Sequence, residues 1–359
     1  MIKEAIISAI NGKDLSAADM EKTMDLILDG RVASSQIGSL VTALRMKGET
    51  VAEITGAARA LRKRAARLDL DNGLLSLGRD DIHVERETVL ATTGSEASGT
   101  RTFNISTATM FIAAAGGVKM ARHGNRAASR YFGAGDVLES LGVNLEISTS
   151  DMEKCIQDLG IGFIFKPLMS GPMQHVGNFR EEMGIRTIFN LIAPLINPAG
   201  AEAYVLGVYD PALTEKMALV LSELGATSAF VVHGEMTNDE ISLCGATTVA
   251  RLAAGRVEKQ VIEPEDYGFK RVGLEAIKGG DAAANAQIVR DILGGEPGPK
   301  RDIAVLNAAA AFITAGRDND FESGIERAVA TIDSGKAQSK LDALVAFTEQ
   351  CRPFVRKEL

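Results

Sequence analysis

The chain has 359 residues, of which 46% are hydrophobic, so it can bury a large core and is not intrinsically disordered. Its 47 acidic residues outnumber its 39 basic residues and give a net charge of −8, which argues against a protein that coats nucleic acid or an anionic membrane. Three widely spaced cysteines without a CxxC pair predict reduced thiols in a cytoplasmic protein. Since no segment has roughly 18 uninterrupted apolar residues, neither a membrane anchor nor export is expected.

Helical spacing of apolar residues continues through the first 68 residues and predicts an all-helical domain at 1–70. Ser16 is a suitable N-cap for one helix. Thr50 and Glu53 have the spacing of a capping box at the start of a later helix, which ends near residue 67. The basic residues of that helix are expected to form a solvated face: Arg59, Arg62, Lys63, Arg64 and Arg67.

The pattern changes after residue 70 and predicts a second domain at 71–359. From residue 88 it reads strand, glycine-rich turn, helix and strand, which is typical of an α/β sheet. Compact apolar runs at 204–208 and 229–233 indicate central strands. Residues 151–185 lean helical again and are expected to return to the helical domain. Further helices are predicted at 212–224, 303–315 and 321–332.

Three clusters of small and polar residues follow one another between residues 92 and 136. The loop at 92–102 has the glycine and hydroxyl residues that let phosphate approach backbone N–H groups. Next, polar residues at 104–107 precede a buried helix, whose N-terminus favours anions. The third cluster carries Arg122 and Arg126 on a turn. Each cluster alone fits an ordinary loop, but their succession favours a phosphate site.

Asp239 and Glu240 follow the apolar run that ends at His233. Two carboxylates on a loop suit Mg²⁺, which keeps water ligands and bridges phosphate oxygens. An acidic pair in a loop is otherwise a solvated surface feature, and the pair alone does not decide between these interpretations.

These motifs resemble the anthranilate phosphoribosyltransferases of tryptophan biosynthesis. The resemblance covers essentially the whole chain and is carried by RMKGET at 45–50, NIST at 104–107, HGNR at 123–126, Gly133, DVLE at 136–139, LGV at 141–143, GIGF at 160–163, Arg180, GIRTIFN at 184–190, NP at 197–198, GVYDP at 207–211, HG at 233–234, DEIS at 239–242 and NAAA at 307–310. It implies a small N-terminal all-helical domain and a larger α/β domain with a central, mostly parallel sheet, as in nucleoside phosphorylases and phosphoribosyltransferases.

The resemblance also implies a reaction and an assembly. The 5-phosphoribosyl group would move from phosphoribosyl pyrophosphate to an aromatic amine, with anthranilate the leading acceptor, and pyrophosphate would leave with the help of Mg²⁺. An aromatic amine is unprotonated at neutral pH, so positioning and electrostatics can supply most of the rate. A homodimer is implied, and the helical start offers apolar residues for it, such as Ile37, Leu40, Val41 and Leu44.

The implied site residues fall into three groups. The Mg²⁺ ligands would be Ser106, Asp239 and Glu240. The donor would contact Thr93, Gly94, Asn104, Thr107, Arg122 and Ser129. The acceptor would contact Asn125 and Arg180, with His123 and Gly124 beside them. A surface ion pair for Arg180 and a structural hydrogen bond for His123 stay open as alternatives.

The chain departs from the family pattern where the donor is expected to bind. The family's phosphate loop reads Gly-Thr-Gly-Gly-Asp-Gly, whereas residues 92–102 read TTGSEASGTRT. These side chains leave less room for a phosphate to approach the backbone N–H groups, but they add new hydrogen-bond donors for it. Arg122 replaces a family lysine and keeps the positive charge, which is now carried by a planar guanidinium group. Other departures are Arg130, Phe132, Ala134 and the MTN segment at 236–238.

Two alternatives follow from these departures. One is a paralogue that acts on a different ring acceptor, or a pentosyl phosphorylase that uses free phosphate. The other is a catalytically silent homologue that binds a ligand or nucleic acid. The altered loop favours the second alternative, while the retained Asp239, Glu240, Asn125 and Arg180 oppose it, as does the acidic balance.

Overall fold

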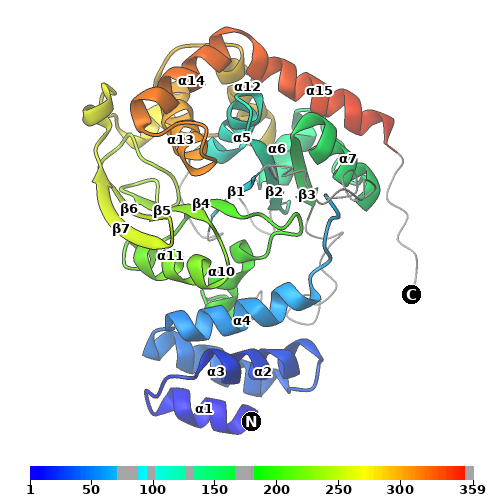
Figure 1. Cartoon of the computed structure of the whole chain (residues 1–359), viewed down its shortest axis with the longest axis vertical. Coiled ribbons are helices and arrows are strands. Elements are labelled where there is room, and N and C mark those ends of the chain that lie inside the picture. The colour runs from blue at the N-terminus through cyan, green and yellow to red at the C-terminus, as the bar shows by residue number, and fades with distance from the viewer. Residues whose placement is uncertain (71–87, 95–101, 127–132, 166–178, 180–181, 352–359) are drawn as a thin grey trace, which may run out of the picture.

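The structure, a computed structural model, describes residues 1–70, 88–94, 102–126, 133–165, 179 and 182–351. Its N-terminal part is a stack of helices at one end of the molecule (Figure 1). They are α1 (Ile2–Ile10), α2 (Ala17–Leu28), α3 (Ser34–Lys47) and α4 (Val51–Arg64). The predicted caps are confirmed, because Ser16 Oγ accepts from the Asp19 backbone N–H and both bonds of the Thr50–Glu53 capping box form.

A seven-stranded sheet forms the centre of the larger domain in the described residues. Its strands are β1 (Val89–Gly94), β2 (Lys119–Gly124), β3 (Ile161–Phe165), β4 (Ala203–Gly207), β5 (Ser228–Gly234), β6 (Thr247–Ala253) and β7 (Arg256–Ile262). The order is β3-β2-β1-β4-β5-β6-β7, with parallel pairing from β3 to β5 and antiparallel pairing from β5 to β7. The predicted α/β fold with a mostly parallel sheet is confirmed.

Helices cover both faces of this sheet, as Figure 1 shows. They are α5 (Ile105–Ala115), α6 (Ala134–Ser140), α7 (Thr149–Leu159), α10 (Ile188–Ile192), α11 (Leu213–Glu223), α12 (Ala282–Leu293), α13 (Pro299–Thr314), α14 (Phe321–Asp333) and α15 (Lys336–Gln350). Single-turn 3₁₀ helices lie at Ala193–Leu195, Pro264–Tyr267 and Leu274–Ile277. None of the helices in the described ranges is both long and apolar enough to span a membrane.

Alternate residues of a strand pack into two separate hydrophobic cores, one on each face of the sheet. Leu90 of β1 packs into a core with α5, α12 and α13, whereas Val89 and Ala91 pack into a core with α10, α11 and the N-terminal helices. This alternation follows from the two-residue period of a strand. The helical domain therefore shares its core with one face of the sheet.

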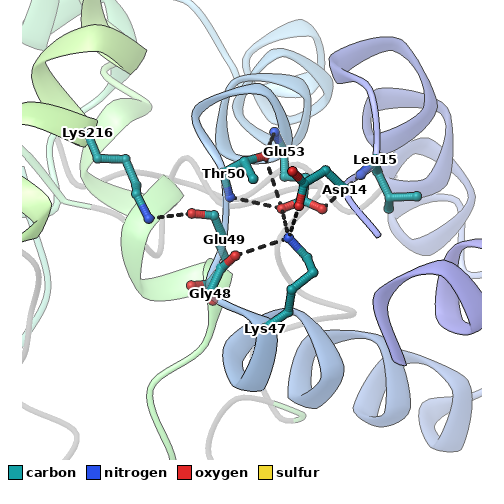
Figure 2. A network of polar contacts seen from close by, with 8 residues as sticks. All are labelled: Asp14, Leu15, Lys47, Gly48, Glu49, Thr50, Glu53 and Lys216. Atoms are coloured by element: carbon teal, nitrogen blue, oxygen red, sulfur yellow. Dashed lines mark hydrogen bonds and ion pairs between the residues drawn. The ribbon is translucent and has the colours of Figure 1, made fainter. Parts of the chain in front are cut away.

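A buried polar network holds the junction of α3 and α4 (Figure 2). Glu53 is fully buried and accepts hydrogen bonds from the backbone N–H of Leu15 at 3.0 Å and of Thr50 at 2.9 Å. Lys47 Nζ lies 3.0 Å from Glu53 Oε2 and 2.7 Å from Asp14 Oδ1. The buried carboxylate is thus matched by a cation and by several donors, as a buried charge requires.

Two expectations about the helical domain are wrong. Arg62 does not lie on a solvated face: its guanidinium donates to the Leu195 and Leu224 carbonyls and to the Tyr204 hydroxyl, which ties α4 to the α/β domain. The apolar residues offered for a second copy are instead buried within one protomer, namely Ile37, Leu40, Val41 and Leu44.

The segment at 151–185 is divided between different surroundings. Its first part forms α7, which packs against β2, β3 and α15. Phe179 and Met183 lie beside Gly38 of α3. The positions at 166–178 and 180–181 lie outside the described residues, so the return of this segment and the limits 1–70 and 71–359 stay predictions.

Candidate active site

The strand order reverses beside β1, because β2 pairs with one edge of β1 and β4 pairs with the other. Ligands of open α/β sheets bind at such a switch point, outside the carboxyl ends of the strands. Gly94 and Gly207 end β1 and β4 and are partners in register. A Cβ on Gly94 would lie 2.4 Å from Asp239 Oδ2, and one on Gly207 would lie 2.0 Å from the Asp239 carbonyl oxygen. Glycine is therefore required at Gly207, where the neighbour is backbone, whereas a side chain at Gly94 would displace the Asp239 carboxylate.

The acidic pair sits in a tightly bonded connection between β5 and β6. Gly234 and Asn238 exchange two backbone hydrogen bonds of 2.8 Å, and Asn238 adopts a left-handed φ of 56°. The buried Thr237 donates its hydroxyl to the Glu240 carbonyl at 3.1 Å. These bonds fix the backbone on both sides of Asp239.

Asn307 of α13 clamps the residue after the acidic pair. Its amide oxygen accepts from the Ile241 N–H at 2.9 Å, and its amide nitrogen donates to the Ile241 carbonyl at 2.9 Å. The side chain is buried, so both bonds are shielded from water. Sequence reasoning placed Asn307 only within a family motif and assigned it no role. A lone amide inside an alanine-rich helix was the available signal.

The two carboxylates repel each other and are partly buried. Burial raises the pKa of Asp239 to about 6. Burial and then the charge of Asp239 raise the pKa of Glu240 to about 8. In the opposite direction, the charge of Arg122 and hydrogen bonds from the hydroxyl and backbone N–H of Ser106 favour ionised Glu240. The predicted metal ligands Ser106, Asp239 and Glu240 are therefore brought together from α5 and the β5–β6 connection.

Arg122 of β2 lies among the same groups. Its Nη1 donates to Thr107 Oγ1 at 3.1 Å, which joins two residues predicted to bind the donor. Burial lowers the pKa of the guanidinium, and the charges of Glu240 and Asp239 act against this shift. A guanidinium keeps its proton under such conditions, so it supplies a fixed positive charge.

Two other residues predicted to bind the donor border this group. Asn104 is the N-cap of α5, and its Oδ1 accepts from Asn285 Nδ2 at 3.0 Å. Asn285, which sequence reasoning did not single out, also accepts from the Gly280 N–H at 2.8 Å and so holds Asn104 against α12. Thr93 is partly buried beside Gly94 at the end of β1.

The HGNR residues at the end of β2 and just after it have different surroundings. His123 is buried, and its Nε2 lies 3.3 Å from the Ala193 carbonyl oxygen, which matches the structural alternative. Gly124 ends β2, and Asn125 is exposed beyond it. Arg126 stacks over the Phe165 ring and pairs with Glu139 and Glu146, so its charge is compensated on the surface.

Several predicted positions lie outside the described residues. They are the loop at 95–101, Ser129 and Arg180, together with the departures Arg130 and Phe132. Their assignments stay predictions.

Comparison with known proteins gives two family models that cover most of the chain. Residues 3–65 match the helical bundle domain of the glycosyl transferase family, and residues 87–338 match its α/β domain. Anthranilate phosphoribosyltransferase from Trichlorobacter lovleyi is 49% identical over 97% of this chain and 100% of its own length. The enzyme from Geobacter sp. strain M21 is 50% identical over 98% and 99%. The chain belongs to the anthranilate phosphoribosyltransferase family.

Solved structures agree with this membership. Anthranilate phosphoribosyltransferase from Thermus thermophilus superposes with a TM-score of 0.86 at 38% identity, covering 96% of this chain and 99% of that chain. The chain is thus an enzyme of the phosphoribosyltransferase class, related to tryptophan biosynthesis.

Proposed function

We propose that this chain transfers the 5-phosphoribosyl group from phosphoribosyl pyrophosphate to anthranilate and releases pyrophosphate in a Mg²⁺-dependent reaction. One observation carries the proposal: the start of α5, the Arg122 guanidinium and the acidic pair meet at the switch point of the sheet. This combination offers an anion site and a cation site side by side, which a metal-bound diphosphate requires.

The donor set fits Mg²⁺. In the part of the chain that the structure describes, no three His, Cys, Asp or Glu side chains gather into a metal-binding group. A divalent ion would therefore rely on Asp239, Glu240 and the Ser106 hydroxyl, completed by water and phosphate oxygens. Hard oxygen ligands and retained water are the preference of Mg²⁺. When bound, the ion would neutralise charge on the leaving diphosphate.

The protein's own groups would hold and orient the donor. Backbone N–H groups at the start of α5 favour a phosphate group, and Arg122 adds a fixed charge that needs no reorganisation during the reaction. Asn125 and Arg180 would orient the acceptor, since an arginine can pair bidentately with an aromatic carboxylate. Yeast anthranilate phosphoribosyltransferase, which shares this fold at 24% identity, has been solved with phosphoribosyl pyrophosphate and Mg bound.

The test is turnover by the purified chain. With phosphoribosyl pyrophosphate, anthranilate and Mg²⁺, we expect pyrophosphate release that stops when Mg²⁺ is chelated. A panel of aromatic amines and carboxylates at equal enzyme concentration identifies a paralogue if anthranilate is not the best acceptor. No turnover with any acceptor, together with no donor binding by calorimetry, would overturn the proposal and favour the silent homologue.

The homodimer belongs to the same proposal but rests on different residues from those first expected. Ile7 and Ile10 of α1 and Met46 of α3 expose 58%, 67% and 84% of their surface. Exposed apolar side chains of this size favour burial against another surface. Light scattering should give twice the mass of one chain, and a monomer at micromolar concentration would contradict the dimer.

A further inference from the structure

The chain that leads into α12 lies directly against the start of α5. The Phe103 backbone N–H donates to the Ile277 carbonyl at 3.2 Å. A Cβ on Gly279 would lie 2.7 Å from the Phe103 Cα atom and 2.5 Å from Asn285 Oδ1. Glycine at this position therefore allows the two backbones to approach, and it brings α12 beside the N-terminus of α5.

The fold determines which way the Asn285 amide points. The side chain is 4% exposed, and its Oδ1 accepts from the Gly280 backbone N–H at 2.8 Å. A backbone N–H can only donate, so the atom that meets it must be the amide oxygen. The amide nitrogen of Asn285 is then the atom that lies 3.0 Å from the Asn104 side chain.

The same reasoning fixes the Asn104 amide. The Asn285 nitrogen can only donate, so the Asn104 atom that meets it is the amide oxygen, Oδ1. Although Asn104 is the N-cap of α5, its side chain makes no capping hydrogen bond. Within the described ranges of the chain, no group accepts a hydrogen bond from Asn104 Nδ2, and the side chain is only half-buried. Its two N–H donors are therefore available to a ligand.

We propose that Asn285 is a positioning residue, which holds the Asn104 amide so that its nitrogen donates to phosphate oxygens of phosphoribosyl pyrophosphate. The inference rests on the proposed function, because Asn104 is among the residues predicted to bind that donor. Ionised phosphate oxygens accept hydrogen bonds, so an amide turned the other way would present its own oxygen and repel them. The Gly280 N–H thus sets the polarity of a side chain on another helix through Asn285.

A residue that acts through Asn104 should lose its effect when the Asn104 amide is removed. Asn104→Ala should raise the KM for phosphoribosyl pyrophosphate roughly tenfold, since a hydrogen bond to a charged group is lost. Asn285→Ala leaves the Asn104 amide free to rotate and should raise this KM roughly threefold. The double variant should match Asn104→Ala within about twofold, because no amide is left to orient. The kcat and the KM for anthranilate should stay within about twofold in all three variants.

Asn285→Asp separates the orientation of the amide from the packing around it. The aspartate keeps the shape of asparagine and accepts from the Gly280 N–H, but it has no donor for Asn104. The Asn104 amide should then turn its nitrogen to the carboxylate and its oxygen to the ligand, which raises the KM for the donor roughly thirtyfold. Ala284→Asp is the charge control, because it adds the same charge at an exposed neighbouring position and should change this KM less than about twofold.

A second control tests the loss of a buried polar side chain elsewhere. Thr314 is 3% exposed, and its hydroxyl donates to the Ala310 carbonyl within α13 at 2.6 Å. Thr314→Val should leave every constant unchanged. The measurements are steady-state kinetics with both substrates and calorimetry with phosphoribosyl pyrophosphate and Mg²⁺ in the absence of acceptor. Circular dichroism first shows that each variant is folded, and Asn285→Leu, of similar volume, replaces Asn285→Ala in the cycle if the alanine variant does not fold.

The inference is supported if Asn285→Ala has no effect in the Asn104→Ala background and if Asn285→Asp binds the donor more weakly than Asn285→Ala. An equal effect of Asn285→Ala in both backgrounds, or a milder effect of Asn285→Asp, would show a packing role and overturn it. An unchanged donor KM in either alanine variant overturns it too, as does an equal rise in Ala284→Asp and Asn285→Asp. In each of these cases wild-type turnover leaves the proposed function intact, whereas a wild type without turnover and without donor binding would reject the proposed function itself.

Discussion

Two glutamates in this protein, one fully buried and one partly buried, have opposite environments. Glu53, in the helical domain, accepts from two backbone N–H groups, from the Thr50 hydroxyl and from Lys47. Glu240, at the edge of the sheet, accepts from Ser106 but faces the like charge of Asp239, and its pKa rises to about 8. A carboxylate whose charge is fully matched by protein groups therefore supports the fold. A carboxylate that faces a like charge is instead suited to bind a metal cation from solution.

The largest effect should come from breaking the matched site. Glu53→Ala removes the acceptor of the Leu15 and Thr50 backbone N–H groups and leaves Lys47 with only its exposed partners, the Asp14 carboxylate and the Gly48 carbonyl. Removing one partner of a buried pair costs about 3–5 kcal/mol, so the free energy of unfolding in urea should fall by this amount. Asp14→Asn is the matched control, because the Asp14 side chain is 64% exposed and its ion pair with Lys47 should contribute about 1 kcal/mol or less. Equal losses in the two variants would refute the contrast.

The next effect should appear at the unmatched site, in activity rather than in stability. Glu240→Gln removes one anionic ligand and should lower turnover at fixed Mg²⁺ by about a hundredfold, equivalent to roughly 3 kcal/mol of charge stabilisation. The unliganded variant should be at least as stable as the wild type, since the repulsion from Asp239 is relieved. Pyrophosphate release and urea denaturation measure the two quantities. A loss of stability like that of Glu53→Ala would place Glu240 with the structural carboxylates.

A third effect concerns the pH dependence of Mg²⁺ binding. Because folding raises the pKa of both acids, their protonated forms favour the folded state, and this stabilisation is lost as the pH rises through about 6 for Asp239 and about 8 for Glu240. Mg²⁺ binds the ionised forms, so its affinity should fall roughly tenfold for each pH unit below 8. Calorimetry at pH 6, 7 and 8 checks this. An affinity that stays constant over this range would contradict it.

The smallest effect should come from Glu49, whose charge is matched less completely than that of Glu53 but better than that of Glu240. It is buried, and burial raises its pKa although Arg45 and Lys216 oppose the shift. The wild type should therefore lose stability as the pH rises above the unfolded pKa of about 4.3. Glu49→Gln cannot ionise and should be more stable than the wild type at pH 8 by about 1 kcal/mol or less, with no such gain at pH 4. Thermal melts of both proteins at both pH values test this prediction. A variant that is more stable than the wild type at pH 4 alone would show that the pKa of Glu49 is lowered in the folded state.

Local chemistry made much of the fold predictable. Ser16, Thr50 and Glu53 cap helices through neighbours in sequence, and the apolar runs at 204–208 and 229–233 became β4 and β5 because their burial on both faces leaves a continuous pattern. The antiparallel β6 and β7 were not predicted. Their two-residue turn is Ala254-Gly255, both at positive φ, and it lacks the asparagine or aspartate that usually signals such a hairpin.

Long-range contacts explain the errors. Arg62 resembles its basic neighbours in sequence, but only the docking of α4 on the sheet brings three acceptor groups to its guanidinium. Likewise, Arg122 and Arg126 stand in one cluster, yet Arg122 points to Thr107 and the acidic pair while Arg126 pairs with Glu139. Arg122 lies within β2, whereas Arg126 follows the end of that strand, so the two side chains meet different partners, and the partner decides the role.

The order of residue types along the chain was enough to recognise the available chemical groups: hydroxyls at the start of a buried helix, a guanidinium in the second cluster of basic residues, and an acidic pair after a strand. It also determined the family, through motifs in a fixed order. The folded arrangement was needed to show that Ser106, Arg122 and Glu240 meet, and that Tyr209 lies against Arg45 and Arg186. The reason is that parallel strands distant in the chain bring their carboxyl ends to one edge, where charges interact through space regardless of their separation in sequence.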